Sequence, residues 1–389
     1  MSENNIFVTS PPRIAPILAN ELRDMGFKNL EIEKKGVHLK GRFLDTMKMN
    51  LYLRTANRVL YKIKSFRATN AEDLYKHAKS IPWENYIELD SYFSVQSSVR
   101  NEKIRDNRYA NLNLKDAIVD RMMEKTGRRP DSGPDYGKVV IFLFWNENDA
   151  TVYYDTSGET ISRRIYRKNP WKAPMNEALA AATILASRWD HKQPFVNPMC
   201  GSGTLAIEAA LISMNKAPGI DRENFSFMHS KMHDSRVWRM LRNEALIKTK
   251  RKPLATIIAS DNSTGAITAA RENAKNAGVS KFIDFQTCDY RDTTLPDEKG
   301  VVFLNPEYGE RLGEVNPLKE VYKEIGDFFK NKCQDFIGYI FTGNMDLAKS
   351  VGLATSKKTP LFNAKIDCRL LEYELYSGSK RNTDDLINE

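Results

Sequence analysis

The feature that most constrains this chain is a glycine-rich turn between a short apolar run and a helix-like segment. Phe195 and Val196 end the run, Gly201 and Gly203 follow, and apolar residues recur at helical spacing over 205–212. A strand, a glycine turn and a helix start form a nucleotide-type site, because glycine lets the backbone approach a ligand that a Cβ would exclude. A Gly-x-Gly pair also occurs in ordinary turns, so this assignment needs support from the rest of the chain.

Two later stretches supply that support. Residues 255–261 are predicted to form a second buried strand that ends in Asp261, and 301–304 a further strand that runs into Asn305-Pro-Glu-Tyr308. An acid in the position of Asp261 can accept hydrogen bonds from both ribose hydroxyls of a nucleoside, although Asp is also common at helix N-caps. Asp289 ends another predicted strand, where it is either an acceptor for an adenine amino group or a simple turn residue.

The order of the predicted elements indicates the fold class, which is α/β. Strands alternate with helices over 175–350, which is typical of an open, mostly parallel sheet with helices on both faces, and an antiparallel hairpin is expected over 361–376. Strands alternate with two helices in the first 160 residues, as in a small α+β sandwich. We therefore expect the chain to be divided into the ranges 1–50, 51–160 and 161–389.

Ligands of such parallel sheets bind beyond the carboxyl ends of the strands. These ends are predicted at 197–203, Asp261, Asp289 and 305–308, so the four stretches should share one rim of the sheet. The turn lacks Gly-Lys-Ser/Thr, which argues against a triphosphate site. A nicotinamide dinucleotide fits less well, because Ala206 stands where its fingerprint has a third glycine, and because it gives 305–308 no role.

Composition narrows the class of protein. The chain has 389 residues, a net charge of +9 and four scattered cysteines. It has no apolar run of membrane-spanning length, no N-terminal signal segment and no Cys-x-x-Cys, so we expect a cytoplasmic protein without a zinc site or disulfides. His229 and His233 are four residues apart, but no carboxylate motif accompanies them, and no metal is expected.

The positive charge is concentrated in one part of the chain. The range 161–250 has 15 Lys and Arg against 7 Asp and Glu, which suits a polyanionic partner but also an ordinary basic surface. A basic connector lies within it at 162–174, followed later by a polar insertion over 217–252. Interleaved aromatic residues make the connector either a clamp for RNA phosphates and bases or a solvated linker. The candidate RNA-binding cations are Arg163, Arg164, Arg167 and Lys168.

Asn305-Pro-Glu-Tyr308 suggests chemistry on a nucleobase amine. Such an amine is a poor nucleophile, because its lone pair is delocalised into the ring, so acceptors must hold its N–H groups and aim the lone pair at a methyl donor. The Asn305 side chain and the Pro306 carbonyl can accept two such hydrogen bonds. Tyr308 can stack on a base extruded from its helix. The tetrapeptide is also compatible with a plain turn that ends a strand.

Together these motifs resemble the bacterial rRNA guanine-N2 methyltransferases in which a THUMP domain precedes an S-adenosylmethionine-dependent Rossmann-like domain. The likeness covers nearly the whole chain, although only the loop 197–204 and the Asn-Pro motif are specific by themselves. The stretches that carry the resemblance are 10–12, 117–120, 129–130, 155–159, 163–167, 173–177, 197–204, 305–311 and 368–370.

The resemblance implies a ferredoxin-like and THUMP region that recognises folded RNA by its shape and backbone, followed by a Rossmann-like methyltransferase domain. It implies that the target guanine amine lies at Asn305, Pro306 and Tyr308. It also implies an S-adenosylmethionine site, made by Asn197, Pro198, Cys200, Gly201, Ser202, Gly203, Thr204, Asp261, Asn262, Asp289, Tyr290 and Asn305.

The chain departs from the family pattern at two positions. Glu307 stands where a second proline is usual, and it either faces solvent or interacts with the target amine. Ile165 stands where a glycine is usual. The resemblance favours 23S rRNA as substrate, either free or in a ribosome precursor. The alternatives are a tRNA guanine-N2 methyltransferase, a DNA adenine-N6 methyltransferase and a non-catalytic RNA-binding assembly factor.

Overall fold

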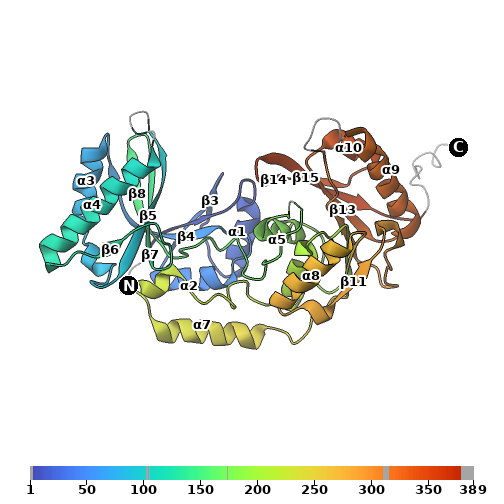
Figure 1. Cartoon of the computed structure of the whole chain (residues 1–389), viewed down its shortest axis with the longest axis horizontal. Helices are drawn as coiled ribbons and strands as arrows, with labels where there is room; N and C mark the ends of the chain where they lie inside the picture. The colour runs from blue at the N-terminus through green and yellow to red at the C-terminus, as the bar shows by residue number, and fades with distance from the viewer. Residues whose placement is uncertain (1–2, 102–103, 105, 173, 310–314, 378–389) are drawn as a thin grey trace. The chain divides into compact units, whose positions relative to one another are not determined.

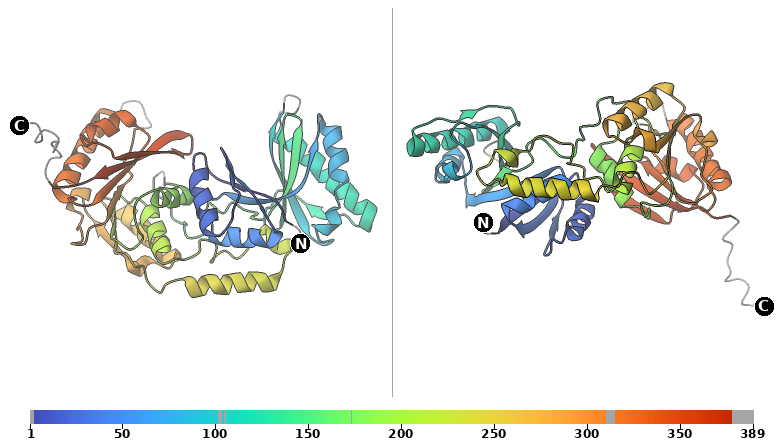
Figure 2. Two further views of the ribbon diagram at one scale, coloured as in Figure 1. Left: turned by 180° about the vertical axis from the view of Figure 1, so that it is seen from behind. Right: turned by 90° about the horizontal axis from the view of Figure 1, so that it is seen from below.

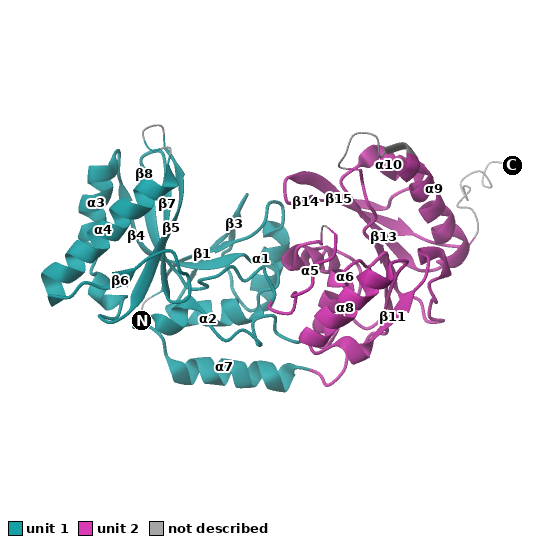
Figure 3. Cartoon of the chain, in the orientation of Figure 1, with its two compact units in different colours: residues 1–164, 216–249 teal, residues 165–215, 250–389 magenta. Residues whose placement is uncertain are grey.

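The computed structural model describes residues 3–101, 104, 106–172, 174–309 and 315–377, and the chain forms two compact units (Figures 1 and 3). Unit 1 comprises Met1–Arg164 and Lys216–Thr249, and unit 2 comprises Ile165–Asn215 and Lys250–Glu389. The segment Lys216–Thr249, which the sequence placed within the range 161–389, therefore belongs to unit 1. Three contiguous ranges cannot include this assignment, because the residues that the segment packs against lie early in the chain.

Within the described residues, unit 1 is built on a sheet of eight strands in the order β2-β3-β1-β4-β8-β7-β5-β6. Most neighbours are antiparallel, whereas β5 runs parallel to β6 and β7. The strands are β1 (Asn4–Thr9), β2 (Glu31–Glu33), β3 (Gly36–Gly41), β4 (Arg58–Arg67), β5 (Tyr92–Arg100), β6 (Asp131–Ser132), β7 (Val139–Asn146) and β8 (Asp149–Asp155). The helices are α1 (Ala15–Asp24), α2 (Phe43–Tyr52), α3 (Ala71–Lys79), α4 (Asn107–Thr126) and α7 (Ser235–Lys248), with 3₁₀ turns η1 (Trp83–Asn85) and η2 (Ser226–His229).

The helices of unit 1 share one hydrophobic core with the sheet. Leu18 of α1, Met47 of α2 and Leu114 of α4 are fully buried, and they belong to the same cluster as Ile6 and Ile141 of the strands. The inserted segment joins this cluster through Trp238 and Leu241 of α7. α3 and α4 pack side by side (Figure 2). The sequence analysis expected two helices in the first 160 residues, whereas the described residues of that range form four, α1 to α4.

Within the described residues, unit 2 is built on a sheet of seven strands in the order β11-β10-β9-β12-β13-β15-β14. The first five run parallel, and β14 and β15 form the expected antiparallel hairpin. The strands are β9 (Phe195–Pro198), β10 (Ile257–Asp261), β11 (Ile283–Thr287), β12 (Val301–Leu304), β13 (Ile337–Thr342), β14 (Lys357–Asn363) and β15 (Ile366–Glu374). The helices are α5 (Glu177–Leu185), α6 (Thr204–Ser213), α8 (Thr264–Asn276), α9 (Val315–Lys332) and α10 (Met345–Ser350), with 3₁₀ turns η3 (Ser280–Phe282) and η4 (Tyr290–Asp292).

Local signals position these elements as predicted. The Ser263 hydroxyl caps α8 by accepting a hydrogen bond from the Ala266 N–H, and the hairpin bends at Ala364, whose φ is 53°. Because the strand order reverses at β9, right-handed crossovers put α6 and α8 on one face of the sheet and α9 on the other. The prediction of an open, mostly parallel sheet is confirmed. None of the helices in the described part of the chain is both long and apolar enough to cross a bilayer.

Candidate functional site

The two halves of the predicted site lie at one edge of the unit 2 sheet. From β9, the chain first adds β10 and β11 on one side of that strand and then returns to place β12 on the other. Ligands of such sheets bind in the crevice outside the strand ends where the order reverses. The glycine turn follows β9 and Asn305 follows β12, so both stretches border this crevice.

Hydrogen bonds join three strand ends at that edge. The Asn197 side chain, which is 1% exposed, donates from Nδ2 to the Phe303 carbonyl of β12 at 2.9 Å. The Gly201 N–H donates to Asp261 Oδ2, at the end of β10, at 3.0 Å. The turn is thus fixed to both neighbouring strands before any ligand binds.

The two glycines of the turn have different structural requirements. Gly203 has φ = 78°, and a Cβ built on it would lie 2.9 Å from the Cβ of Ala270 in α8. Gly201 has φ = 54°, and a Cβ there would meet no atom within 4 Å. Gly203 therefore permits close packing of the turn on α8, whereas the side of Gly201 that lacks a side chain faces open space where a ligand can approach.

The other members of the predicted cofactor loop support the turn. Pro198 ends β9 and is buried, and Ser202 and Thr204 are each 5% exposed. Burial raises the pKa of the Cys200 thiol, so it is protonated at neutral pH. A protonated thiol is a poor nucleophile, and Cys200 therefore has no sign of a covalent role.

Asp261 is not the N-cap residue of α8, which is the alternative that the sequence left open. Its Oδ2 accepts from Gly201, and its Oδ1 accepts from the Ser263 N–H at 3.0 Å, while Ser263 itself caps the helix. A carboxylate has about four lone-pair sites, so acceptor capacity remains for ribose hydroxyls. Asn262 beside it is exposed and adjoins the same crevice.

Asp289 is engaged by its own turn. Its Oδ1 accepts from the N–H and Nε of Arg291 at 2.9 and 2.8 Å, and these bonds lower the pKa of the Asp289 carboxyl. The Tyr290 ring is buried and meets Phe328 edge to face, with a centroid distance of 5.6 Å. The structure therefore shows a turn aspartate and a core tyrosine. Recognition of an adenine here would use the backbone or require Asp289 to exchange partners.

Asn305 has the clearest sign of an external partner. Its Oδ1 is buried, and no described residue donates a hydrogen bond to it. A buried acceptor without a donor costs roughly 1–3 kcal/mol, so such an atom is expected where a ligand supplies the hydrogen. Pro306 is buried behind it, whereas Glu307 is exposed. The last two residues of the motif stretch, 310 and 311, lie outside the described residues.

Tyr308 is held by residues that sequence reasoning missed. Its hydroxyl accepts a hydrogen bond from Asn363 Nδ2 at 2.7 Å, and its carbonyl accepts from Asn344 Nδ2 at 3.4 Å. A Cβ on Gly343 would approach the Tyr308 ring to 3.1 Å. Asn363 ends β14, where the sequence showed only a bend, so no local signal could have linked it to Tyr308.

Two of the four predicted RNA-binding cations are engaged by protein atoms, one of them buried and the other partly buried. Arg164 is 8% exposed, and its guanidinium donates to the Ile161 carbonyl and, at 2.6 Å, to the Arg54 carbonyl. Arg167 donates to the Met175 carbonyl and forms an ion pair with Glu177 at 3.3 Å. Both guanidinium groups thus already bind protein atoms, and a contact of either one with RNA stays a prediction.

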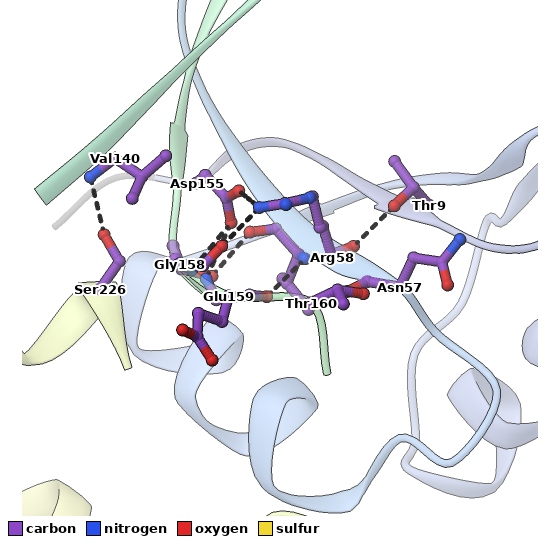
Figure 4. Close-up of polar contacts among 12 residues, drawn as sticks. Thr9, Asn57, Arg58, Val140, Asp155, Gly158, Glu159, Thr160 and Ser226 are labelled. Atoms are coloured by element: carbon purple, nitrogen blue, oxygen red, sulfur yellow. Dashed lines mark hydrogen bonds and ion pairs between the residues drawn. The ribbon is translucent and has the colours of Figure 1, made fainter. Parts of the chain in front are cut away.

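Arg163 and Lys168 are exposed and stay candidates for RNA contact. The chain just before the connector is held within unit 1. Figure 4 shows Arg58 directed at the Asp155 carboxylate and the Gly158 carbonyl. Burial raises the pKa of Asp155 in spite of this ion pair.

The crevice fits S-adenosylmethionine. Asn197 Oδ1 is a buried acceptor without a donor among the described residues, and Gly201 leaves space beside the turn. Asp261 provides carboxylate oxygens next to that space. An amino acid joined to a nucleoside presents ammonium and hydroxyl donors, which are the groups that such acceptors bind.

Family models match all three parts of the chain. Residues 164–372 match the family described as "RMKL-like, methyltransferase domain". Residues 5–60 match an RlmL ferredoxin-like domain, and residues 68–155 match a THUMP domain. The expected fold class, a ferredoxin-like and THUMP region before a Rossmann-like methyltransferase domain, is confirmed.

Individual proteins with similar sequences or structures are also methyltransferases by name. The ribosomal RNA large subunit methyltransferase K/L of Syntrophotalea carbinolica is 35% identical over 379 residues, which are 95% of this chain and 53% of that protein. The chain thus spans about half the length of such relatives. A Synechocystis sp. protein, provisionally named an RNA methyltransferase, is 32% identical, with 95% of this chain and 96% of that protein covered. The crystal structure of SMU.472, a provisionally named methyltransferase in complex with SAH, has a TM-score of 0.88 at 30% identity and covers 98% of this chain and all of that one.

Proposed function

The chain belongs to the family of RMKL-like methyltransferases with S-adenosylmethionine as cofactor, and from this premise we propose that it methylates the exocyclic N2 of a guanosine in 23S rRNA. Relatives that carry the name ribosomal RNA large subunit methyltransferase K/L support the RNA class of the substrate. The THUMP domain over 68–155 supports a folded RNA. The guanine amine as target rests on the chemistry of the motif after β12.

The observation that carries this proposal is the buried Oδ1 of Asn305, to which no described residue donates a hydrogen bond. In the proposed complex it accepts one N–H of the guanine amine, and the Pro306 carbonyl accepts the other. These two bonds turn the amine lone pair toward the crevice beside Gly201. S-adenosylmethionine supplies an electrophilic methyl group when it is bound there. Preorganised acceptors of this kind lower the barrier because they need not reorient during the reaction.

Tyr308 supports the base in this proposal. A guanine paired within a helix cannot reach the crevice, so it must leave its stack, and an aromatic ring compensates for part of the lost stacking. Asn363 holds the Tyr308 hydroxyl at 2.7 Å, which keeps the ring in a fixed orientation. Asp261 and the backbone of the turn hold the cofactor on the opposite side of Asn197.

Nucleoside mass spectrometry of purified 23S rRNA and tRNA tests the proposal. A strain that lacks the gene should lose one N2-methylguanosine from 23S rRNA, and the wild-type chain should restore it. Loss from tRNA alone would favour the tRNA alternative, and loss of N6-methyladenine from DNA would favour the DNA alternative. Unchanged nucleosides, together with no binding of S-adenosylmethionine in calorimetry, would favour an assembly factor without catalysis.

A further inference from the structure

Asn273 of α8 is a buried polar residue that the site described above does not include. It is 1% exposed. Its Oδ1 accepts hydrogen bonds from the N–H groups of Lys168 and Asn169, at 3.2 and 3.1 Å. Its Nδ2 donates to the Asn169 carbonyl at 2.8 Å and to the Ser202 carbonyl at 3.3 Å. A side-chain amide can make about four hydrogen bonds, so the protein uses the whole capacity of this one.

These bonds join two segments that are separate in the chain. Lys168 and Asn169 belong to the connector over 162–174, whereas Ser202 belongs to the glycine turn after β9. All the partners are backbone groups, whose roles as donor or acceptor are fixed, so they determine which end of the amide carries the nitrogen. Arg167 of the connector makes a second bond of this kind, from Nη2 to Thr204 Oγ1 at 3.2 Å. The connector and the turn are therefore fastened to each other as well as to α8.

The bond to Ser202 restricts the conformation of the turn. The peptide unit between Ser202 and Gly203 is planar. Its oxygen accepts from Asn273, and its N–H donates to the Cys200 carbonyl at 2.9 Å. A peptide plane that is held at both its oxygen and its N–H cannot rotate unless one of these bonds breaks. Its orientation is thus set before a ligand binds.

Packing of α8 against the same turn supports this restriction. Ala270 lies three residues before Asn273, which places the two side chains on the same side of the helix. The Cβ of Ala270 leaves no room for a side chain at Gly203, where an added Cβ would approach it to 2.9 Å. An apolar contact and a hydrogen bond from one helix therefore act on two successive residues of the turn.

We propose that Asn273 is a positioning residue for cofactor binding, which holds the Ser202 peptide so that the turn accepts S-adenosylmethionine beside Gly201. Asn273 acts through the turn and does not touch the cofactor. A turn that is already in its bound conformation loses less conformational freedom when the ligand binds, so the affinity is higher. This inference rests on the cofactor site of the proposed function, but not on the identity of the methylated base.

The same helix provides a control three residues further along. Asn276 Nδ2 donates to the Tyr166 carbonyl at 3.1 Å, so this amide also binds the chain at the connector. In the described part of the chain, none of the hydrogen bonds of the Asn276 side chain reaches the glycine turn. Alanine at either position removes an amide that binds the connector, but only the change at Asn273 removes a bond to the turn.

Calorimetry with S-adenosylmethionine on the full chain tests the inference. Asn273→Ala should raise the Kd about fivefold, as expected for the loss of one hydrogen bond that preorganises the turn. Asn276→Ala should leave the Kd within about twofold of wild type. The stoichiometry of binding should not change. A variant that was only less stable would instead bind with a lower stoichiometry and a wild-type Kd.

The inference is wrong if Asn273→Ala binds S-adenosylmethionine with the wild-type Kd, or if both variants weaken binding equally. Thermal unfolding shows whether Asn273→Ala is folded. If it is not, Asn273→Ser decides by the same comparison, because its hydroxyl lies one bond nearer the helix and does not reach the Ser202 carbonyl.

The same measurements separate this inference from the proposed function. If the Kd values change as expected but no guanosine is methylated in any RNA, the proposed function fails and the positioning role of Asn273 stands. If the wild-type chain does not bind S-adenosylmethionine, both fail.

Discussion

The two sheets of this protein make side chains available in different ways. The parallel sheet of unit 2 has helices on both faces, so its polar groups for ligands lie at the edge where strands end, as at Asp261 and Asn305. The mostly antiparallel sheet of unit 1 has its helices on one face, and Phe142 and Phe144 lie on the other. Helices connect strands in both units, but in unit 2 the strand order reverses at β9, which puts the connecting helices on opposite faces of the sheet.

This difference predicts two kinds of response to substitution. A crevice at a strand edge places few groups around one reacting atom, so loss of one group should abolish the chemistry. A sheet face distributes contacts over many side chains, so each loss should reduce affinity in part. The four predictions that follow concern unit 2, where the loss of a single group should have the largest effect on activity or stability.

Asn305→Ala should have the largest effect. It removes the buried acceptor that we assign to the guanine amine, and methyl transfer should fall by on the order of 10²-fold or more. The affinity for S-adenosylmethionine, measured by calorimetry, should stay within a few-fold of wild type. A collapse of cofactor affinity with the substitution would mean that Asn305 holds the cofactor and not the base.

Arg167→Ala should destabilise the fold more than it affects RNA binding. It leaves Glu177, whose side chain is 4% exposed, without its guanidinium partner, and the free energy of unfolding should fall by about 3 kcal/mol. Urea unfolding measures this change. Arg163→Ala is the matched control, and as an exposed site it should change stability by less than about 0.5 kcal/mol. If Arg167→Ala weakened RNA binding and left the free energy of unfolding unchanged, Arg167 would instead contact RNA phosphates.

The two glycines of the turn should separate stability from cofactor binding. Gly203→Ala forces a Cβ against Ala270 at a positive φ and should lower the free energy of unfolding by roughly 1–3 kcal/mol. Gly201→Ala meets no protein atom, so it should cost less stability and instead weaken cofactor binding. Melting curves without S-adenosylmethionine measure the stability of each variant, and the shift on adding it measures cofactor binding. If S-adenosylmethionine raised the melting temperature of Gly201→Ala as much as that of the wild type, the space beside Gly201 would not be part of the cofactor site.

Glu307→Pro should have the smallest effect. The Glu307 side chain is exposed, and proline would restore the residue usual in the family that the sequence resembles, so turnover should stay within a few-fold of wild type. Steady-state methyl transfer to RNA provides the measurement. A large loss of turnover with intact cofactor binding would show that Glu307 takes part in the reaction.

The sequence was informative wherever the signal was local. The apolar strand that ends in Asp261 and the apolar run of β12 were legible from neighbouring residues, and they placed Asp261 and Asn305 correctly at strand ends. Two helices of unit 1 were missed. Phe43, Met47 and Leu51 of α2 follow a helical spacing, yet the sequence analysis expected only two of the four helices that the structure describes in the first 160 residues.

By itself the sequence determined the βα order of unit 2, the glycine turn and the rim of polar residues, because periodicity and turn chemistry act between residues that are close in the chain. Tertiary structure alone decided that Lys216–Thr249 joins unit 1, that Arg164 is buried against Arg54, and that Asn363 holds Tyr308. These outcomes depend on partners tens to hundreds of residues away. Burial and hydrogen bonding at such separations are set by packing, which no local pattern encodes.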